Sequence, residues 1–212
     1  MVEKIGIYGG SFNPIHFGHI HLAIDMLEMR NLEKILFCPA ALNPHKMESK
    51  ELVASEHRLA MLKLAIMDIP QFSILESELK RPSPSYTIDT INELLANDEP
   101  FVNESHDDQK QKNHYFLIVG DDTVENFHHW HKAHELIEKV EVLVGVRSEK
   151  CFDAMTNLDP LIDEALKVGR TLTRIFEVSS TEIRNRIAAE KYCGHLVPAK
   201  VLDYIYRNRL YC

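Results

Sequence analysis

The sequence predicts an α/β fold in which a mostly parallel, doubly wound sheet carries helices on both faces. The first observation is alternation, because short runs rich in β-branched and aromatic residues are separated by longer stretches with apolar residues at helical spacing. The second is that the runs YFLIV and VEVLVGV are almost continuously apolar, which is typical of parallel strands buried on both faces. The third is that a glycine pair closes the first apolar run just before a helical stretch, as expected of a strand–turn–helix unit.

Each expected element follows from the same two patterns, taken in order along the chain. An expected strand is a short apolar run, and an expected helix has apolar residues three or four positions apart. The expected strands span residues 5–8, 35–38, 72–75, 115–119, 140–146 and 175–178. The expected helices span residues 20–29, 55–68, 86–96, 161–168, 180–190 and 198–208.

Two stretches interrupt this alternation. Residues 97–113 (NDEPFVNESHDDQKQKN) are polar and almost free of core-forming side chains, so we expect a surface loop there. Residues 148–169 form an extra segment that we interpret as an insertion. Neither is expected to be a domain boundary, because expected strands resume after each. We therefore predict a single domain over residues 1–212, with its C-terminal helices within 180–208.

Composition excludes several classes of protein. Lys and Arg number 24 and Asp and Glu number 32, so the formal net charge is −8, which disfavours a nucleic-acid partner. No apolar run approaches the roughly 20 residues that a membrane span needs, so no membrane partner is expected. The cysteines are far apart, a spacing typical of reduced thiols in a cytoplasmic protein; they are Cys38, Cys151, Cys193 and Cys212.

The stretch HHWHKAH at residues 128–134 raises the question of a metal site. His131 and His134 would share a face on a helix, and imidazole suits transition metals. No nearby cysteine completes a ligand set, and the neighbouring carboxylates have unusual spacing. We therefore predict no metal ligands among these residues.

The string GGSFNPIHFGH at residues 9–19 is the strongest candidate for chemistry. It follows the first expected strand and leads into the first expected helix, the place where open parallel sheets bind ligands. Gly9 and Gly10 would let the backbone turn and approach a phosphate. His16 and His19 would lie on one face of the first helical turn and donate hydrogen bonds to phosphate oxygens, beside the positive end of the helix. The string contains neither GxGxxG nor GxxxxGK[ST], which excludes a dinucleotide fingerprint and a P-loop.

A second phosphate-binding candidate is VSSTEIR at residues 178–184. Ser179 and Glu182 have capping-box spacing, which predicts the start of a helix. Ser180 and Thr181 would supply hydroxyl and N–H groups at the positive helix end, and Arg184 would add a charged donor one turn later.

These two strings resemble the GxFxPxHxGH and SSTxIR signatures of the nucleotidylyltransferase superfamily. Four further strings make the bacterial nicotinate mononucleotide adenylyltransferases the most similar branch: NPHK at 43–46, PSYTIDT at 84–90, GDD at 120–122 followed by a tryptophan at 130, and VGVR at 144–147. The resemblance implies a Rossmann-like fold. It also implies an enzyme of NAD biosynthesis that joins ATP and nicotinate mononucleotide into nicotinate adenine dinucleotide and pyrophosphate.

The residues and the resemblance together assign roles within the site. The predicted catalytic residues are His16, His19, Lys46 and Arg184. The predicted ATP-binding residues are Gly9, Gly10, Ser11, Phe12, Gly18, Gly120, Asp122, Arg147, Ser179, Ser180 and Thr181. The predicted residues for nicotinate mononucleotide are Asn43, His45, Lys46, Ser85, Tyr86, Thr87 and Trp130, with the tryptophan stacking on the pyridine ring.

The predicted reaction is a direct in-line attack of the acceptor's 5′-phosphate on the α-phosphorus of ATP, which requires no nucleophilic residue. We expect Mg²⁺ to be bound mainly through ATP phosphates and water rather than by a dedicated cage of carboxylates. The alternatives are the same chemistry on nicotinamide mononucleotide or phosphopantetheine, and a nucleotide-binding module without catalysis. The sequence leaves open whether the protein forms a homo-oligomer.

Overall fold

A computed structural model of the chain describes residues 2–41, 52–81, 86–97, 113–146 and 159–212. The strands are β1 (Lys4–Gly10), β2 (Lys34–Pro39), β3 (Phe72–Ile74), β4 (His114–Gly120), β5 (Glu141–Val146) and β6 (Arg170–Leu172). The helices are α1 (Phe17–Met29), α2 (Ser55–Ile66), α3 (Ser77–Lys80), α4 (Thr87–Asn97), the 3-10 helix η2 (Asp121–His129), α5 (Ala133–Lys139), α7 (Pro160–Val168), α8 (Ser180–Ala188) and α9 (Ala199–Arg207).

The six strands form one parallel sheet in the order β3-β2-β1-β4-β5-β6. In the central register, Ile7 pairs with Leu36 on one side and with Leu117 on the other. The connections run in opposite directions from the boundary between β1 and β4. A crevice forms at such a switch point, outside the carboxyl ends of the two strands.

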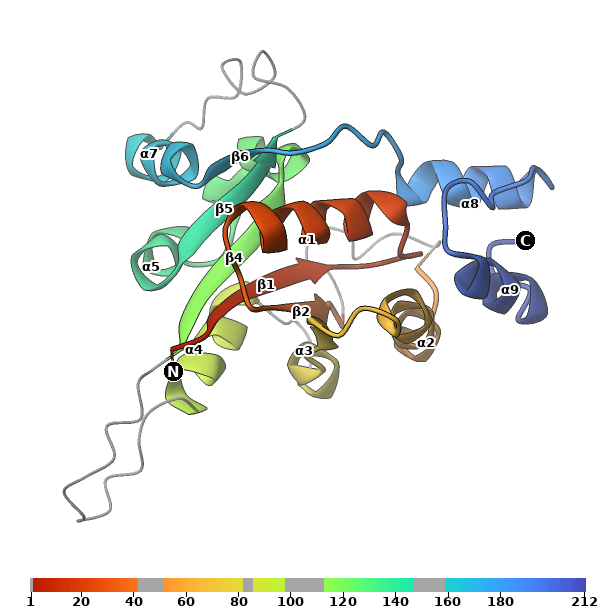
Figure 1. The fold of residues 1–212 in the computed structure, drawn as a ribbon, viewed down its shortest axis with the longest axis horizontal. Coiled ribbons are helices and arrows are strands. Elements are labelled where there is room, and N and C mark those ends of the chain that lie inside the picture. The colour runs from red at the N-terminus through yellow and green to blue at the C-terminus, as the bar shows by residue number, and fades with distance from the viewer. Residues whose placement is uncertain (1, 42–51, 82–85, 98–112, 147–158) are drawn as a thin grey trace.

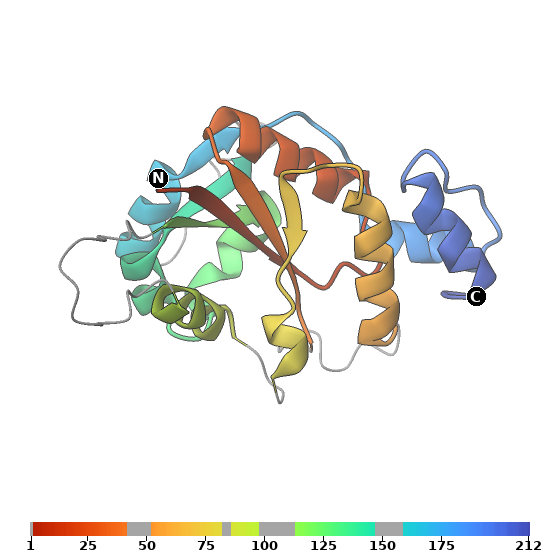
Figure 2. The ribbon, with the colours of Figure 1, turned by 60° about the horizontal axis from the view of Figure 1, so that its bottom comes forward.

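The alternation of side chains along the strands builds two separate cores, one on each face of the sheet. In β4, Phe116 and Ile118 face one core, whereas Tyr115, Leu117 and Val119 face the other. Helices α1, α2, α8 and α9 cover the first core, and α4, η2, α5 and α7 cover the second. Helix α1 lies across one face of the sheet in Figure 1, and the turned view of Figure 2 shows α4 on the other side. The predicted doubly wound α/β fold is therefore confirmed.

The two C-terminal helices lie together at one end of the molecule (Figures 1 and 2). Helix α9 packs on α2, where the His57 Nδ1 atom lies 2.9 Å from the Tyr204 hydroxyl and the Lys200 ammonium lies 2.9 Å from Asp68. The chain end therefore returns to the face that carries α1 and α2.

The last predicted strand, at residues 175–178, is wrong. The sixth strand is the short segment RTL of β6, which pairs with β5 through the register Val144 to Arg170. Residues 173–179 instead run from β6 across to α8 (Figure 1). Phe176 stacks on the His21 ring of α1 with a centroid separation of 4.7 Å, so its apolar side chain serves helix packing rather than the sheet.

Other differences concern element ends and short helices. Helix α1 begins at Phe17 rather than at residue 20, because His16 caps it. Helices α3, η2 and α5 were not predicted, and α7 agrees with the helix expected at 161–168. Most of the expected loop at 97–113 and the first part of the expected insertion lie outside the described residues. Among the described helices, none is long and apolar enough to cross a membrane.

Candidate functional site

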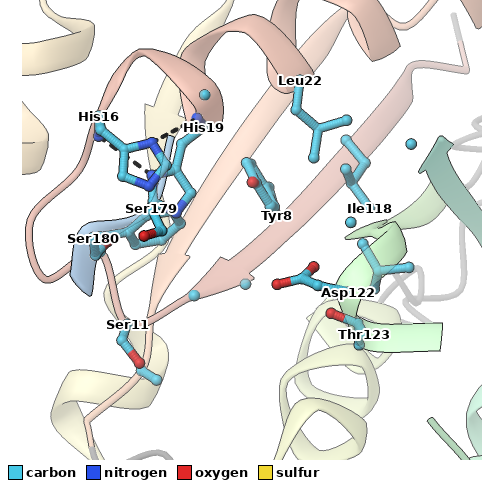
Figure 3. Close-up of a pocket in the computed structure, with 18 of the residues that line it drawn as sticks. Tyr8, Ser11, His16, His19, Leu22, Ile118, Asp122, Thr123, Ser179 and Ser180 are labelled. Carbon is cyan, nitrogen blue, oxygen red and sulfur yellow. Dashed lines mark hydrogen bonds between the residues drawn. The ribbon is translucent and has the colours of Figure 1, made fainter. Parts of the chain in front are cut away.

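A cavity of about 850 Å³ lies at the carboxyl ends of β1 and β4, at the switch point of the sheet. We call it the central cavity (Figure 3). Every predicted site residue that the structure describes lines it. These are Gly9, Gly10, Ser11, Phe12, His16, Gly18, His19, Tyr86, Thr87, Gly120, Asp122, Trp130, Ser179, Ser180, Thr181 and Arg184.

Five predicted site residues fall outside the described residues. Asn43, His45 and Lys46 belong to the segment 42–51, Ser85 to 82–85, and Arg147 to 147–158. Their roles stay predictions.

His16 and His19 form a reciprocal cap at the N-terminus of α1. The His19 N–H donates to Nδ1 of His16 at 3.4 Å, and the His16 N–H donates to Nδ1 of His19 at 3.3 Å. The two rings stack with centroids 3.7 Å apart, and Figure 3 shows them beside Ser179 and Ser180. The capping bonds orient both imidazoles through Nδ1. His16 is therefore the N-cap of α1, one residue before the first turn in which it was predicted to lie.

The protonation state of His16 follows from its burial. Only 6% of the residue is exposed, and burial lowers the pKa of His16 from 6.5 to about 4. The ring is therefore neutral at neutral pH. Because Nδ1 accepts a hydrogen bond, the proton of the neutral ring resides on Nε2. His16 is thus a neutral hydrogen-bond donor rather than a cation.

The N-terminus of α8 lies directly against the loop that follows β1. The Ser179 hydroxyl accepts from the Glu182 N–H at 3.1 Å, which caps α8 as the sequence predicts. The Ser180 hydroxyl donates to the Pro14 carbonyl at 2.9 Å. The Ser180 hydroxyl therefore joins the two motifs, and the first-turn N–H groups of α8 are what this helix end offers to an anion.

Arg184 joins the same junction from the next turn of α8. Its Nη1 donates to the Asn13 carbonyl at 3.0 Å, and its Nη2 donates to the Thr181 hydroxyl at 3.2 Å. The guanidinium thus lies at the wall of the central cavity, oriented by both motifs.

The turn after β1 differs from the one predicted. Strand β1 continues through Gly10, and among the described residues no glycine has a positive φ. The left-handed turn is made by Phe12 at φ 46°, whose ring is fully buried and packs on Tyr8. A Cβ added to Gly9 would meet nothing within 4 Å. Within the described residues, neither packing nor backbone conformation therefore requires a glycine at this position of the cavity wall.

The opposite wall comes from the end of β4 and the start of η2. Asp122 lies there, and Figure 3 shows its carboxylate on the far side of the cavity from the histidines. Gly120 makes room for this side chain, because an added Cβ would lie 2.7 Å from the Asp122 Oδ1. Burial, with a contribution from Asp122, raises the pKa of Tyr8, so its hydroxyl stays protonated.

A third part of the cavity lies between α4 and the region after η2. Tyr86 and Thr87 lie at the start of α4, and the centroids of the Tyr86 and His131 rings are 4.3 Å apart. Trp130 stacks on Phe127 with centroids 4.9 Å apart and planes 22° apart. One indole face is therefore covered, while the residue still lines the cavity.

Sequence reasoning missed Arg58, which is 1% exposed and lies under the loop after β1. Its guanidinium donates to the carbonyls of Ser11 at 2.9 Å, Ala40 at 2.7 Å, Ala41 at 3.1 Å and Val53 at 3.3 Å. A signal existed, since Arg58 lies four residues before the buried Leu62, on the apolar face of α2.

Two further charged residues that line the cavity, Arg174 and Glu78, were also missed. The carboxylate of Asp25, 2% exposed, pairs with Arg174, whose main-chain N–H also donates to it at 2.8 Å. Glu78 is 6% exposed and accepts from the Thr90 hydroxyl at 3.2 Å, and burial raises the pKa of this carboxyl. Neither residue belongs to a recognisable motif.

Within the described ranges, no cluster of three or more His, Cys, Asp or Glu side chains could hold a metal ion. In the HHWHKAH stretch, His134 pairs instead with Asp159 at 2.8 Å.

Comparisons with known proteins identify the family of the chain. The cytidylyltransferase-like family model matches residues 7–186. The nicotinate-nucleotide adenylyltransferase of Bacillus subtilis (strain 168) is 36% identical over 210 residues, covering 99% of both chains. A relative from Geobacillus kaustophilus, named a probable nicotinate-nucleotide adenylyltransferase, is 39% identical over 212 residues, covering 98% of this chain and 86% of the relative.

A solved structure of similar fold is that of Plasmodium falciparum nicotinic acid mononucleotide adenylyltransferase complexed with APC. It matches with a TM-score of 0.67 and 19% identity, covering 99% of this chain and 97% of that chain. Since the family model matches most of the chain and the relatives align over nearly all of it, this protein belongs to the cytidylyltransferase-like family and, within it, to the nicotinate-nucleotide adenylyltransferases.

Proposed function

We propose that the protein transfers the adenylyl group of ATP to nicotinate mononucleotide, giving nicotinate adenine dinucleotide and pyrophosphate. The observation that carries this proposal is the meeting of two helix N-termini, those of α1 and α8, at one wall of a cavity that extends to Tyr86 and Trp130. The family membership and the relatives' names support the same reaction.

The phosphates of ATP would bind where these two helices begin. His16 would donate from Nε2, and His19 would act beside it on the oxygens of the α- and β-phosphates. The first-turn N–H groups of α8 and the Arg184 guanidinium would bind the remaining charge. A neutral His16 has a mechanistic advantage, because it needs no protonation at the pH of the cytoplasm.

Nicotinate mononucleotide would occupy the part of the cavity between α4 and Trp130. The backbone N–H groups at Tyr86 and Thr87, at the N-terminus of α4, would bind the ring carboxylate. The exposed part of the indole would stack on the ring. From the sequence, Asn43, His45, Lys46 and Ser85 are expected to complete this proposed subsite.

In the proposed reaction a phosphate oxygen of nicotinate mononucleotide forms a bond to the α-phosphorus of ATP. The bond from that phosphorus to the bridging oxygen of the β-phosphate breaks, and pyrophosphate leaves with the electron pair. No side chain forms a covalent intermediate. The protein contributes orientation and preorganised donors for the charge of the transition state.

The donor set of the cavity fits a magnesium ion held mainly through phosphates and water. The Asp122 carboxylate, on the wall opposite the histidines, would offer a hard oxygen to such an ion, and Mg²⁺ is commonly bound through one or two carboxylates plus substrate phosphates. Such an ion would neutralise charge on the triphosphate and the leaving pyrophosphate.

The test is pyrophosphate release from ATP and Mg²⁺ with three acceptors in parallel: nicotinate mononucleotide, nicotinamide mononucleotide and phosphopantetheine. Release with the first alone is expected. Equal release with nicotinamide mononucleotide would contradict the carboxylate subsite at Tyr86 and Thr87. Release with phosphopantetheine alone would assign another acceptor. No pyrophosphate release with any of the three acceptors, from protein that still binds ATP, would identify a nucleotide-binding module without catalysis.

A further inference from the structure

The penultimate residue of the chain reaches the loop that carries the first phosphate-binding motif. The Tyr211 hydroxyl donates to Oδ1 of Asn13 at 2.8 Å. Asn13 is only 5% exposed and lies between Ser11 and His16, in the turn that connects β1 to α1. A contact across nearly the whole chain therefore ends inside the site.

Asn13 is held from three directions, and each partner comes from a different part of the chain. Its Oδ1 also accepts from the Val53 N–H at 3.3 Å, just before α2. Its carbonyl accepts from Arg184 of α8 at 3.0 Å. Because His16 follows Asn13 by three residues, a shift of Asn13 would be transmitted to the cap of α1 and to both imidazoles.

Tyr211 is held in place at a conformational cost. Its φ is 66°, in the left-handed region that non-glycine residues rarely adopt. Leu210, 7% exposed, anchors the tail in the core that α9 shares with α2. A backbone held in this region persists only where its surroundings determine it, and here the surroundings are the Asn13 contact and the core.

The phenol of Tyr211 stays a donor over the pH range of an assay. Burial raises its pKa, although the guanidinium groups of Arg184 and Arg58 act in the opposite direction. The hydrogen bond to Asn13 is therefore not lost by ionisation in mildly alkaline buffer.

We propose that Tyr211 is a positioning residue for adenylyl transfer, whose hydroxyl fixes Asn13 and thereby orients the loop that presents His16 and His19 to ATP. The inference rests on the proposed function. It predicts that loss of the hydroxyl lowers kcat/KM for ATP and leaves KM for nicotinate mononucleotide nearly unchanged, because Tyr86 and Trp130, which would bind the acceptor, belong to other elements.

The experiment compares Tyr211→Phe with Tyr206→Phe, a matched loss of one hydroxyl. Tyr206 is on α9, is 49% exposed and does not line the central cavity. At a temperature well below both melting transitions, kcat/KM for ATP is expected to fall about tenfold in Tyr211→Phe, because small errors in position are costly to a transferring group. KM for nicotinate mononucleotide should change by less than about twofold, and Tyr206→Phe should match the wild type.

A double-mutant cycle separates this role from simple anchoring of the tail. If the hydroxyl acts through Asn13, the Asn13→Ala/Tyr211→Phe double variant is no slower than Asn13→Ala alone. Additive losses would overturn the proposal, as would a Tyr211→Phe variant with a lower melting temperature and wild-type kcat/KM for ATP.

Calorimetric titration with ATP and Mg²⁺ keeps the result distinct from failure of the proposed function. If the wild type released no pyrophosphate with any acceptor, a dissociation constant for ATP weakened several-fold in Tyr211→Phe, but not in Tyr206→Phe, would still support the positioning role. Equal ATP affinity in the two variants would then refute it.

Discussion

Lowering the pH should destabilise the fold through His16. Burial lowers the pKa of His16 from 6.5 to about 4. As the pH falls through 6.5, the unfolded chain takes up a proton on this imidazole, whereas the folded chain stays neutral until about pH 4. The unfolded state binds more protons in this window, so the free energy of unfolding falls as the pH falls. Between pH 7.5 and 4.5 the loss amounts to about 2–3 kcal/mol, at about 1.4 kcal/mol for each pKa unit.

Urea unfolding of the wild type and His16→Asn at these two pH values measures this loss. Asparagine keeps a side-chain oxygen that can cap α1, so the variant removes the titration while preserving a helix cap. His21→Asn, on the same helix, controls for the loss of a histidine.

The comparison also removes the effect of other groups. Glu78 acts in the opposite direction. Its pKa is raised in the fold, so the folded chain takes up a proton before the unfolded chain does, and the free energy of unfolding rises as the pH falls. Glu78 is present in every variant, so its effect cancels in the difference. The same loss of stability in His16→Asn as in the wild type would refute the neutral, buried imidazole.

Four further predictions concern activity and packing. His19→Ala should lower kcat by about 10²–10³ with a smaller change in KM, because a preorganised donor to a charged transition state is lost; unchanged steady-state turnover would remove His19 from the site. Trp130→Ala should raise KM for nicotinate mononucleotide and leave KM for ATP unchanged. Initial rates measured while the concentration of each substrate is varied test this, and an unchanged KM for both substrates would contradict the stacking role. Gly169→Ala should cost about 1–3 kcal/mol in thermal unfolding, because the added Cβ would lie 1.6 Å from the Val142 carbonyl. Gly9→Ala should change stability by less than about 0.5 kcal/mol, because its Cβ meets only open space; equal losses in the two glycine variants would contradict the packing described.

The sequence predicted the fold best where periodicity is strong. The run YFLIV indicates β4 because it is short and continuously apolar, with aromatic or β-branched residues at four of its five positions, which is typical of a strand buried on both faces of a sheet. The strand RTL of β6 could not be found from its pattern. Its first and third residues, Arg170 and Leu172, are exposed, and its only buried residue, Thr171, is polar. The run at 175–178 has apolar residues but forms no strand, because Phe176 packs on His21 of helix α1 instead of on the sheet.

The candidate site was predictable where a motif supplies both the residue type and its place. His16, His19 and Ser179 follow from helix-start patterns, and the structure brings them together. Arg58 and Tyr211 act through long-range hydrogen bonds to loop carbonyl and amide groups, and such pairings leave no local pattern. The left-handed turn at Phe12, rather than at a glycine, was equally hidden because local propensity argues against it.

The buried guanidinium of Arg58 has a consequence for how the protein can evolve. It binds the carbonyls of Ala41 and Val53, which flank residues 42–51, together with that of Ser11 in the motif loop. Two described residues on either side of that range are thus bonded to one group on α2. Arg58 is not among the residues that line the central cavity, so substitutions of the lining residues can change what the site binds while this anchor of the loop leading to His16 stays in place.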